Sequence, residues 1–258
     1  MRYVRYAHGD LHMWGLLLND DLIQPLTAAP YLKSVPLGQP VPVSGIRLLA
    51  PCEPSKIVAV GKNYHDHIKE FDSEIPETPI LFLKPTTALN DPGQPIILPP
   101  ASLSGRIDYE GELAVVIKKK AQRIKAADAA DYILGYTCLN DVTARDIQKK
   151  DGQWTRAKGF DGFAPVGPLL TDEVNPANLT IRTRLNGKIV QESTTASLIW
   201  SIGELLEFIT ACMTLNPGDV VTTGTPSGVG PMQDGDVVAI SIEGIGVLTN
   251  PVKSAEQA

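Results

Sequence analysis

Glycine and proline interrupt this chain so often that long helices have little room to form. The 258 residues include 22 glycines and 21 prolines, about one residue in six against about one in eight in average proteins. Short apolar runs lie between these turn-forming residues, a pattern typical of strands joined by turns. Hydrophobic residues make up 43% of the chain, enough to bury a core of ordinary size. We therefore expect a β-rich α+β fold and not a helical bundle.

The first 50 residues differ in pattern from the rest of the chain. Three apolar runs, Arg2–His8, Leu11–Leu18 and Leu22–Leu26, are separated by polar turns and predict a β meander. Six prolines follow between Pro30 and Pro54, and such a stretch should be extended and poor in regular structure. We interpret residues 1–50 as a small N-terminal β module with a proline-rich linker, and residues 51–258 as the main domain.

The main domain is predicted to consist mostly of strands. The clearest helix is Ser201–Met213, because its apolar residues recur at helical spacing and its first serine can cap the N-terminus. A short polar helix should follow Gly61 and run through Glu70. Asn186-Gly187 predicts a tight hairpin turn, since both residues tolerate positive φ. The expected strands are Lys56–Val60, Ile80–Lys84, Ile96–Leu98, Asp108–Lys118, Tyr132–Asn140, Val220–Thr223, Val237–Ile242 and Val247–Leu248.

Two carboxylates, Glu110 and Glu112, interrupt the otherwise apolar strand Asp108–Lys118. Side chains alternate along a strand, so both glutamates share one face, which continues with apolar residues. Two buried carboxylates repel each other unless a cation joins them, and such a pair with a third carboxylate suits a hard divalent ion. Asp141, at the end of an apolar strand, is the best third ligand. The alternative is a solvated face of an edge strand, which spacing alone favours.

A histidine and a glutamate form the second candidate pair. His67 and Glu70 lie three residues apart on the predicted short helix, so the carboxylate can orient the imidazole. A histidine held in this way can act as a general base toward water. An exposed helix turn with both side chains in solvent is the simpler alternative for this pair alone.

Two glycine-containing segments complete the candidates. Lys158 precedes Gly159, and a lysine in such a loop can stabilise developing negative charge, although many such lysines are plain surface residues. The segment Thr222–Gly228 follows an apolar strand and offers donors suited to a carboxylate, or it is only a tight connection. It lacks the lysine of a phosphate-binding P-loop. The chain also lacks a dinucleotide-binding glycine motif and the nucleophile elbow of serine hydrolases.

Composition excludes several classes of partner. The formal net charge is −6 and the only basic run is Lys118–Lys120, so nucleic acid is not an expected partner. No stretch is long and apolar enough to span a bilayer, and the first residues lack the apolar core of a secretory leader. Cys52, Cys138 and Cys212 have no metal-binding spacing. Their odd number suggests a reducing compartment, so we expect buried thiols in a cytoplasmic protein.

The order of the motifs along the chain is more specific than any one of them. From the N-terminus they are Gly61-Lys62-Asn63-Tyr64 with His67 and Glu70, Phe82-Leu83-Lys84-Pro85, Asp108-Tyr109-Glu110-Gly111-Glu112, Asn140–Asp146, Lys158-Gly159-Phe160-Asp161 and Thr223-Gly224-Thr225-Pro226. This series resembles the fumarylacetoacetate hydrolase superfamily, and the resemblance runs from about Lys56 to Leu248. The N-terminal module is similar to the short β prefix of bacterial hydroxyheptadienedioate isomerases and hydrolases.

The resemblance implies a fold, an assembly and a metal ion. Relatives adopt a mixed β-sandwich roll, are usually homodimers, and hold Mg²⁺ or Mn²⁺ in the active site. By position, Glu110, Glu112 and Asp141 match the metal ligands. Lys84 lies within a family motif, but the resemblance assigns it no clear role beyond a structural one.

The resemblance also implies catalytic and substrate-binding residues. His67 and Glu70 match the pair that activates water, on a segment that often closes over substrate in this family. Lys158 matches the lysine beside the oxygen of the developing enolate. The positions that match substrate contacts to a 2-oxo acid are Arg145, Gln148 and Thr225.

The implied chemistry centres on the enolate of a 2-oxo acid, stabilised by the metal and Lys158. If His67 delivers water to a second carbonyl, the C–C bond of an acylpyruvate such as fumarylpyruvate is hydrolysed, and this is the activity we expect. Otherwise the site supports oxaloacetate decarboxylation or tautomerisation, or isomerisation of 2-hydroxyhepta-2,4-diene-1,7-dioate. The residues that select among these reactions should lie in loops such as Asp72–Pro79 and Lys149–Arg156.

Two other classes fit the sequence less well. A non-catalytic metal-binding protein would need no general base, yet the His67–Glu70 pair is complete. A zinc hydrolase is disfavoured because three carboxylates without cysteine or histidine suit a harder ion.

Overall fold

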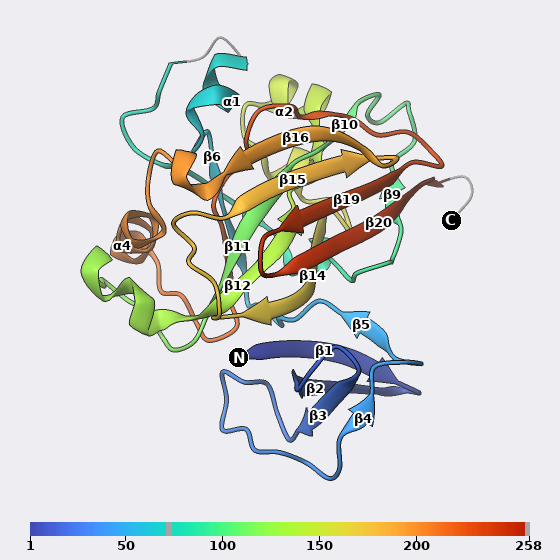
Figure 1. Cartoon of the computed structure of the whole chain (residues 1–258). Coiled ribbons are helices and arrows are strands. Elements are labelled where there is room, and N and C mark those ends of the chain that lie inside the picture. The colour runs from blue at the N-terminus through green and yellow to red at the C-terminus, as the bar shows by residue number, and fades with distance from the viewer. Residues whose placement is uncertain (71–73, 256–258) are drawn as a thin grey trace.

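Strands dominate the computed structural model, which describes residues 1–70 and 74–255 (Figure 1). The strands are β1 Arg2–His8, β2 Leu11–Leu17, β3 Leu22–Leu26, β4 Val41–Pro42, β5 Arg47–Leu49, β6 Ile57–Gly61, β7 Ile80–Lys84, β8 Leu89–Asn90, β9 Ile96–Leu98, β10 Ile107–Tyr109, β11 Gly111–Ile117, β12 Ile133–Asn140, β13 Thr143–Ala144, β14 Ala164–Thr171, β15 Thr180–Leu185, β16 Lys188–Thr194, β17 Val220–Thr222, β18 Gly230–Pro231, β19 Val237–Ile242 and β20 Gly246–Ser254. The α-helices are α1 His65–Glu70, α2 Arg145–Asp151, α3 Thr155–Lys158 and α4 Ile202–Cys212, and short 3₁₀ turns cover Thr86–Ala88, Ala126–Tyr132 and Thr195–Ser197. The expected β-rich α+β class is confirmed.

Three sheets build the molecule, and the two larger ones are mixed. The largest runs in the order β4-β3-β2-β1-β14-β12-β11-β17-β6-β7, with β5 added to β1 and β8 to β14. A second sheet has the order β16-β15-β19-β20-β9 and covers one face of the first (Figure 1). The third is a small sheet, β13-β10-β18. Most pairs are antiparallel, but β17 pairs with β6, β8 with β14 and β9 with β20 in parallel.

The N-terminal meander is present as the sequence predicted. Strands β1, β2 and β3 pair in antiparallel order, and β1 also pairs with β14, so the first residues extend the largest sheet. In Figure 1 this module lies below the remaining strands. The proline-rich stretch is mostly irregular, but β4 and β5 form short strands within it. The boundary at residue 50 falls between β5 and β6.

Strand β11 lies at the centre of the packing, and every one of its residues is buried. Leu113, Val115 and Ile117 pack into one apolar cluster with residues of the second sheet, whereas Ala114 and Val116 enter a different cluster on the opposite face. A strand buried on both faces shows a continuous apolar run. The two glutamates at its start are therefore enclosed by the core of the protein and do not lie on a solvated edge.

The expected continuous strand Asp108–Lys118 is wrong in one respect, because it breaks at Glu110. Strand β10 pairs with β13 and β18, while β11 pairs with β12 and β17, so the two halves belong to different sheets. At the break, the Glu110 amide donates to Asn140 Oδ1 at 2.9 Å, and the Glu110 carbonyl accepts from the Asp141 amide at 2.9 Å. At Glu110 the side chain of Asn140 and the backbone of Asp141 therefore take the place of the regular hydrogen bonds between strands.

Other elements follow the sequence closely, with local exceptions. Ser201 caps α4 in a capping box with Glu204, and Asn186 and Gly187 have the positive φ values of 52° and 81° that the hairpin requires. Strand β20 is longer than the expected Val247–Leu248. Strand β14 was missed because proline and glycine interrupt its sequence. Among the described residues no helix is long and apolar enough to cross a bilayer.

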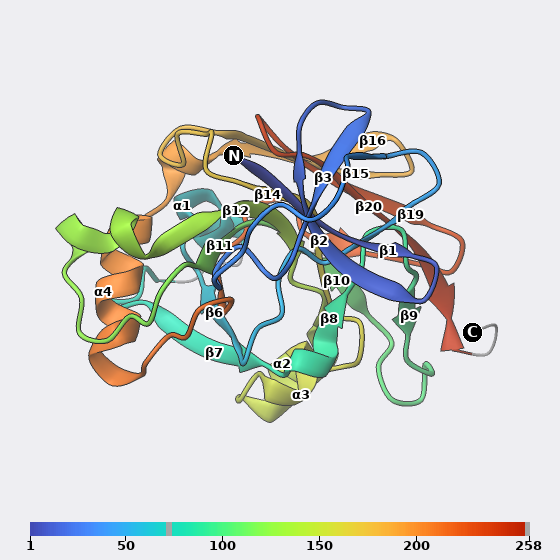
Figure 2. The same ribbon diagram turned by 90° about the horizontal axis from the view of Figure 1, so that it is seen from below.

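The cysteines and the two expected selector loops need correction. Cys52 and Cys138 are buried, but Cys212 is exposed because α4 ends there; all three thiols are free. Lys149–Arg156 is no simple loop, since it holds the end of α2 and the start of α3, which lie side by side (Figure 2). The expected loop Asp72–Pro79 begins outside the described residues.

Candidate active site

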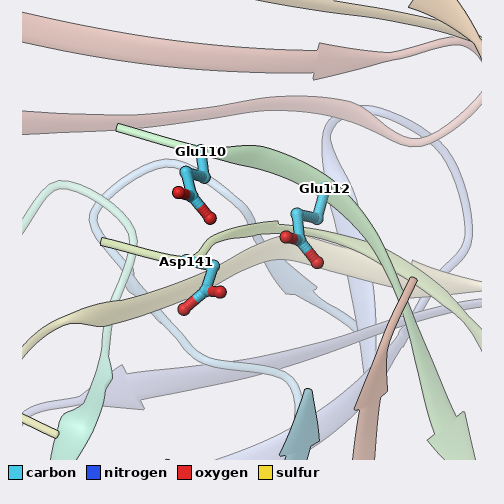
Figure 3. Close-up of side chains that lie close together, drawn as sticks. All are labelled: Glu110, Glu112 and Asp141. Carbon is cyan, nitrogen blue, oxygen red and sulfur yellow. The ribbon is translucent and has the colours of Figure 1, made fainter. Parts of the chain in front are cut away.

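Three carboxylates meet where β10 gives way to β11. Glu110 occupies the break between these strands, Glu112 lies on β11, and Asp141 follows β12, the antiparallel neighbour of β11. One oxygen of each carboxylate lies within 4.8 Å of the others, and all three residues are buried. Figure 3 shows the three side chains close together. The break matters here, because it places Glu110 beside the strand end that carries Asp141.

Three cations surround the carboxylates. Lys158 Nζ bridges Glu110 Oε2 at 2.8 Å and Asp141 Oδ2 at 2.6 Å. Lys84 Nζ donates to Asp141 Oδ1 at 2.6 Å and to the Val142 carbonyl at 3.2 Å. Arg145 forms an ion pair with Glu110 through Nη2. Each of these charges is buried yet paired, as buried charges must be.

The charges shift the pKa values of the two glutamates in opposite directions. Burial raises the pKa of Glu112 well above its ordinary value, and the neighbouring Asp141 and Glu110 raise it further. Burial also acts to raise the pKa of Glu110, but the positive charges of Lys158 and Arg145 outweigh it and hold that pKa well below the usual range. Glu110 is therefore ionised. The raised pKa of Glu112 favours its protonated, neutral form more than in an ordinary glutamate.

The expected loop position of Lys158 is wrong. Lys158 is the last residue of α3, whose turn is closed by its amide donating to the Trp154 carbonyl at 2.9 Å. Its side chain is 2% exposed, so it is no surface lysine. Burial acts to lower the Lys158 pKa, but Asp141 and Glu110 outweigh it and raise the pKa. Lys158 is therefore a fixed cation at the carboxylate cluster.

His67 and Glu70 form the pair that their spacing predicts. His67 Nδ1 lies 3.2 Å from Glu70 Oε2, and His67 is buried against the site. Burial lowers the pKa of His67, although Glu110 and Glu70 act in the opposite direction. Glu70 also accepts a hydrogen bond from the Gly228 amide, at 3.0 Å and 3.2 Å to its two oxygens. This contact ties α1 to the segment after β17.

The segment after β17 offers donors, as expected, but protein groups use them. The Gly224 amide donates to Glu112 Oε2 at 2.9 Å. The Thr225 hydroxyl donates to the Gly111 carbonyl at 2.9 Å and accepts from Gln191 Nε2 at 2.9 Å. The segment therefore fixes one of the three carboxylates in place.

Arg145 also donates hydrogen bonds to two further residues, Asp108 and Gln148. Its Nε donates to Asp108 Oδ2 at 2.9 Å, and its Nη1 donates to Gln148 Oε1 at 2.7 Å. Asp108 is fully buried and also accepts from Arg106. Asp108 was missed as a supporting residue, although it stands two residues before Glu110 in the motif and its exclusion from solvent marks it once the fold is known.

One cavity of about 180 Å³ collects these residues. Eight of the nine candidates line it, and Glu70 reaches it through its contact with His67. Sequence reasoning missed the apolar walls, because single apolar residues carry no chemical signal. The additional lining residues are Val60, Gly61, Lys62, Ile68, Phe82, Lys149 and Trp154.

The carboxylate cluster fits a hard divalent ion. Three carboxylate oxygens within 4.8 Å are the donor type and spacing that Mg²⁺ or Mn²⁺ accepts. The raised pKa of Glu112 is a sign of the same fit, because the cluster lacks positive charge at that side. Glu110, Glu112 and Asp141 would hold the ion. Among the described residues this cluster contains no cysteine thiol and no histidine imidazole.

Comparison with known proteins places both parts of the chain in described families. Residues 56–253 match the family model described as Fumarylacetoacetate (FAA) hydrolase C-terminal, and residues 1–51 match Rv2993c-like, N-terminal. Oxaloacetate tautomerase fahd2 of Xenopus laevis is 45% identical over 222 residues, which are 81% of this chain and 69% of that protein.

Solved structures show the same fold across the whole chain. The 5-carboxymethyl-2-hydroxymuconate delta-isomerase of Mycobacterium smegmatis has a TM-score of 0.92 and 46% identity, with 98% of this chain and 100% of that one covered. Maleylpyruvate hydrolase of Sphingobium sp., solved with manganese(II) and pyruvate, has a TM-score of 0.82 and 30% identity, with 98% and 99% covered.

Proposed function

The chain belongs to the fumarylacetoacetate hydrolase superfamily, and from that membership we propose that it is a divalent-metal-dependent enzyme that hydrolyses the C–C bond of an acylpyruvate. One observation carries the proposal: a cluster of three buried carboxylates and a histidine held by a glutamate line the same cavity. The first part suits the stabilisation of an enolate, and the second suits the activation of water.

The metal ligands in this proposal are Glu110, Glu112 and Asp141. An ion held there, Mg²⁺ or Mn²⁺, would supply Lewis-acid stabilisation of the negative charge that develops on a 2-oxo acid. Manganese and pyruvate in the related maleylpyruvate hydrolase support this choice. The site is too rich in carboxylate for zinc to be the preferred ion.

Lys158 is proposed to stabilise the enolate. An ammonium has three N–H donors, and the contacts of Lys158 within the described chain use two of them, one on Glu110 and one on Asp141. The third can donate to the oxygen on which negative charge develops when the C–C bond breaks. Because its pKa is raised, Lys158 stays protonated in this role.

His67 is proposed to activate the water. With Nδ1 donating to Glu70, the imidazole keeps its lone pair on Nε2, the nitrogen that can accept a proton from water. The lowered pKa of His67 keeps the ring neutral near pH 7, as a base requires. The activated water would attack the second carbonyl of the substrate, and the pyruvate enolate would leave.

Arg145, Gln148 and Thr225 are proposed to position the 2-oxo acid. Arg145 and Gln148 are hydrogen-bonded to each other and lie on the same helix, α2. The Thr225 hydroxyl already donates to Gly111, so its contribution to a ligand is as an acceptor or through its backbone.

A second activity is favoured by particular relatives. The Xenopus protein is an oxaloacetate tautomerase and the mycobacterial structure is a hydroxymuconate isomerase. Oxaloacetate decarboxylation, its tautomerisation and the isomerisation of 2-hydroxyhepta-2,4-diene-1,7-dioate need the enolate site but no attacking water. We keep these reactions as the alternative. For either activity we propose a homodimeric assembly and a cytoplasmic location.

A substrate panel tests the proposal. Acetylpyruvate, fumarylpyruvate, oxaloacetate and a hydroxymuconate diacid are each assayed with Mg²⁺ and with EDTA. Metal-dependent cleavage of an acylpyruvate to pyruvate and a carboxylic acid is the expected result. Turnover of oxaloacetate or the diacid without any acylpyruvate cleavage would move the assignment to the alternative, and no turnover at all would contradict both.

A further inference from the structure

Two lysines line the cavity without a carboxylate partner. Lys62 follows β6 and is partly exposed, and Lys149 is an exposed residue of α2. Within the described residues, neither side chain takes part in an ion pair or a hydrogen bond. The other cations of the cavity, Lys158 and Arg145, are bonded to the inner carboxylates.

The charge of the cavity is therefore unevenly distributed. Its three carboxylates, Glu110, Glu112 and Asp141, belong to one cluster, and Lys158 and Arg145 are committed to that cluster. With Lys62 and Lys149 the cavity lining has four cations against three carboxylates, and the two added charges are not paired with the carboxylates. A cavity lined by uncompensated charge of one sign attracts a ligand of the opposite sign.

Apolar side chains make up another part of the lining. Phe82 and Trp154 pack edge to face with ring centroids 5.1 Å apart. Trp154 lies so close to Gly61 that a Cβ at residue 61 would come within 2.6 Å of the indole. Together with Val60 and Ile68, these rings form an apolar wall that can contact the carbon chain of a ligand. The charged groups of the cavity can then bind the ends of that ligand.

The backbone at Lys62 is itself unusual. Its φ is 56°, in the left-handed region that a residue with a side chain rarely adopts. Such strain persists where the surrounding structure enforces it, and it is frequent at ligand sites. A lysine is therefore held at a turn where glycine or asparagine would be the easier choice.

We infer that Lys62 and Lys149 form a subsite for a second carboxylate, so that the preferred substrate is a 2-oxo dicarboxylate whose carbon chain contacts Phe82 and Trp154. The inference rests on the proposed function for the other end of the ligand, the 2-oxo acid. It adds two specificity-determining residues: Lys62, which follows Gly61 in the first motif, and Lys149, which begins the segment Lys149–Arg156.

Binding of a matched pair of ligands tests the inference. 2-Oxoadipate and 2-oxohexanoate have the same chain length and differ only in a terminal carboxylate against a methyl group. Oxalate has the 2-oxo acid oxygens alone and serves as the reference ligand. Dissociation constants for all three are measured by calorimetry with the Mg²⁺-loaded protein and its variants.

The wild-type protein should bind 2-oxoadipate at least about tenfold more tightly than 2-oxohexanoate, the scale of one charge-assisted contact. The preference for 2-oxoadipate should be smaller in Lys62→Met and in Lys149→Met and should be lost in the double variant. The dissociation constant of oxalate should stay within about twofold of the wild-type value in all three. Lys149→Arg should keep the preference. Lys150→Met is the matched control, because Lys150 is the neighbouring exposed lysine of α2 and does not line the cavity.

The outcomes separate the two ideas. If the protein binds oxalate and cleaves acylpyruvates but shows no preference for 2-oxoadipate, the subsite is wrong and the proposed function stands. A preference that survives in the double variant also overturns the subsite. If oxalate fails to bind and no 2-oxo acid is turned over, the proposed function fails and the subsite with it.

Discussion

The two sides of the active-site cavity are built in different ways. The inner side, defined as Glu110, Glu112 and Asp141 with the cations Lys84, Lys158 and Arg145, is wholly buried. Its members come from β7, β11, the ends of neighbouring strands and two short helices, and they are cross-linked by short ion pairs. The outer side, defined as helix α1, has six residues, of which four are exposed.

The outer side is attached by few contacts. Helix α1 connects to the rest of the site through Glu70, which meets the Gly228 amide, and through the buried His67 and Ile68. A rigid buried network fixes the position of a reactive group, whereas a short, lightly attached helix can be displaced with little loss of stability. The difference teaches that the residues proposed to stabilise the enolate and those proposed to activate water lie in structurally separable parts.

Removing the ion should give the largest effect, because every proposed reaction depends on the inner side. EDTA should abolish turnover of every substrate, and Mg²⁺ or Mn²⁺ should restore it. Glu112→Gln is the sharpest variant, since glutamine resembles the protonated acid that the raised pKa favours. This variant should keep the fold. Its loss of metal affinity should exceed the loss of about 10- to 100-fold that is typical when an outer-shell group is removed. Full activity of the metal-free protein would contradict the assignment.

His67→Ala should remove the function of the outer side alone. Acylpyruvate hydrolysis should fall by about 100- to 10,000-fold, the usual cost of a lost general base. Oxaloacetate decarboxylation should fall much less, because it needs no activated water. Lys158→Ala is the matched comparison on the inner side and should damage both reactions. If His67→Ala leaves hydrolysis within a few-fold of the parent, His67 is not the base.

Two lysine substitutions compare the stability of the two sides directly. Lys84→Met removes a fully buried partner of Asp141 and should lower the free energy of unfolding by about 3 kcal/mol, in the range for breaking a buried ion pair. Lys69→Met breaks the exposed 3.6 Å pair with Asp66 on α1 and should change it very little. Urea unfolding measures both. Equal effects would mean that the inner network has no special role in stability.

The smallest expected effect is a pH dependence of metal binding. The pKa of Glu112 is raised, so below that pKa the metal-free site holds a proton that the ion must displace. Metal affinity should therefore rise with pH, by at most about tenfold per unit, and level off once the carboxyl is ionised. Calorimetry in two buffers of different ionisation enthalpy should detect proton release. An affinity independent of pH would contradict the raised pKa.

Much of the fold follows from local signals in the sequence. The meander of β1, β2 and β3, the hairpin at Asn186-Gly187 and the capped helix α4 each depend on neighbouring residues: apolar runs between turns, positive φ, and a capping box. Their energetics are short-ranged, so the pattern is enough. The candidate residues were also identified from local spacing and from the order of motifs, and the structure brings them to one cavity.

Only the tertiary structure decided what those residues experience. By spacing alone a solvated edge was favoured over a metal site for Glu110 and Glu112, and their burial in the structure excludes the solvated edge. The strand break at Glu110, the helix that buries Lys158 and the ion pair of Lys84 with Asp141 all depend on partners 17 to 57 residues away. Desolvation and pairing act between groups that the fold brings together, so a sequence determines which groups are available and the packing determines their charge.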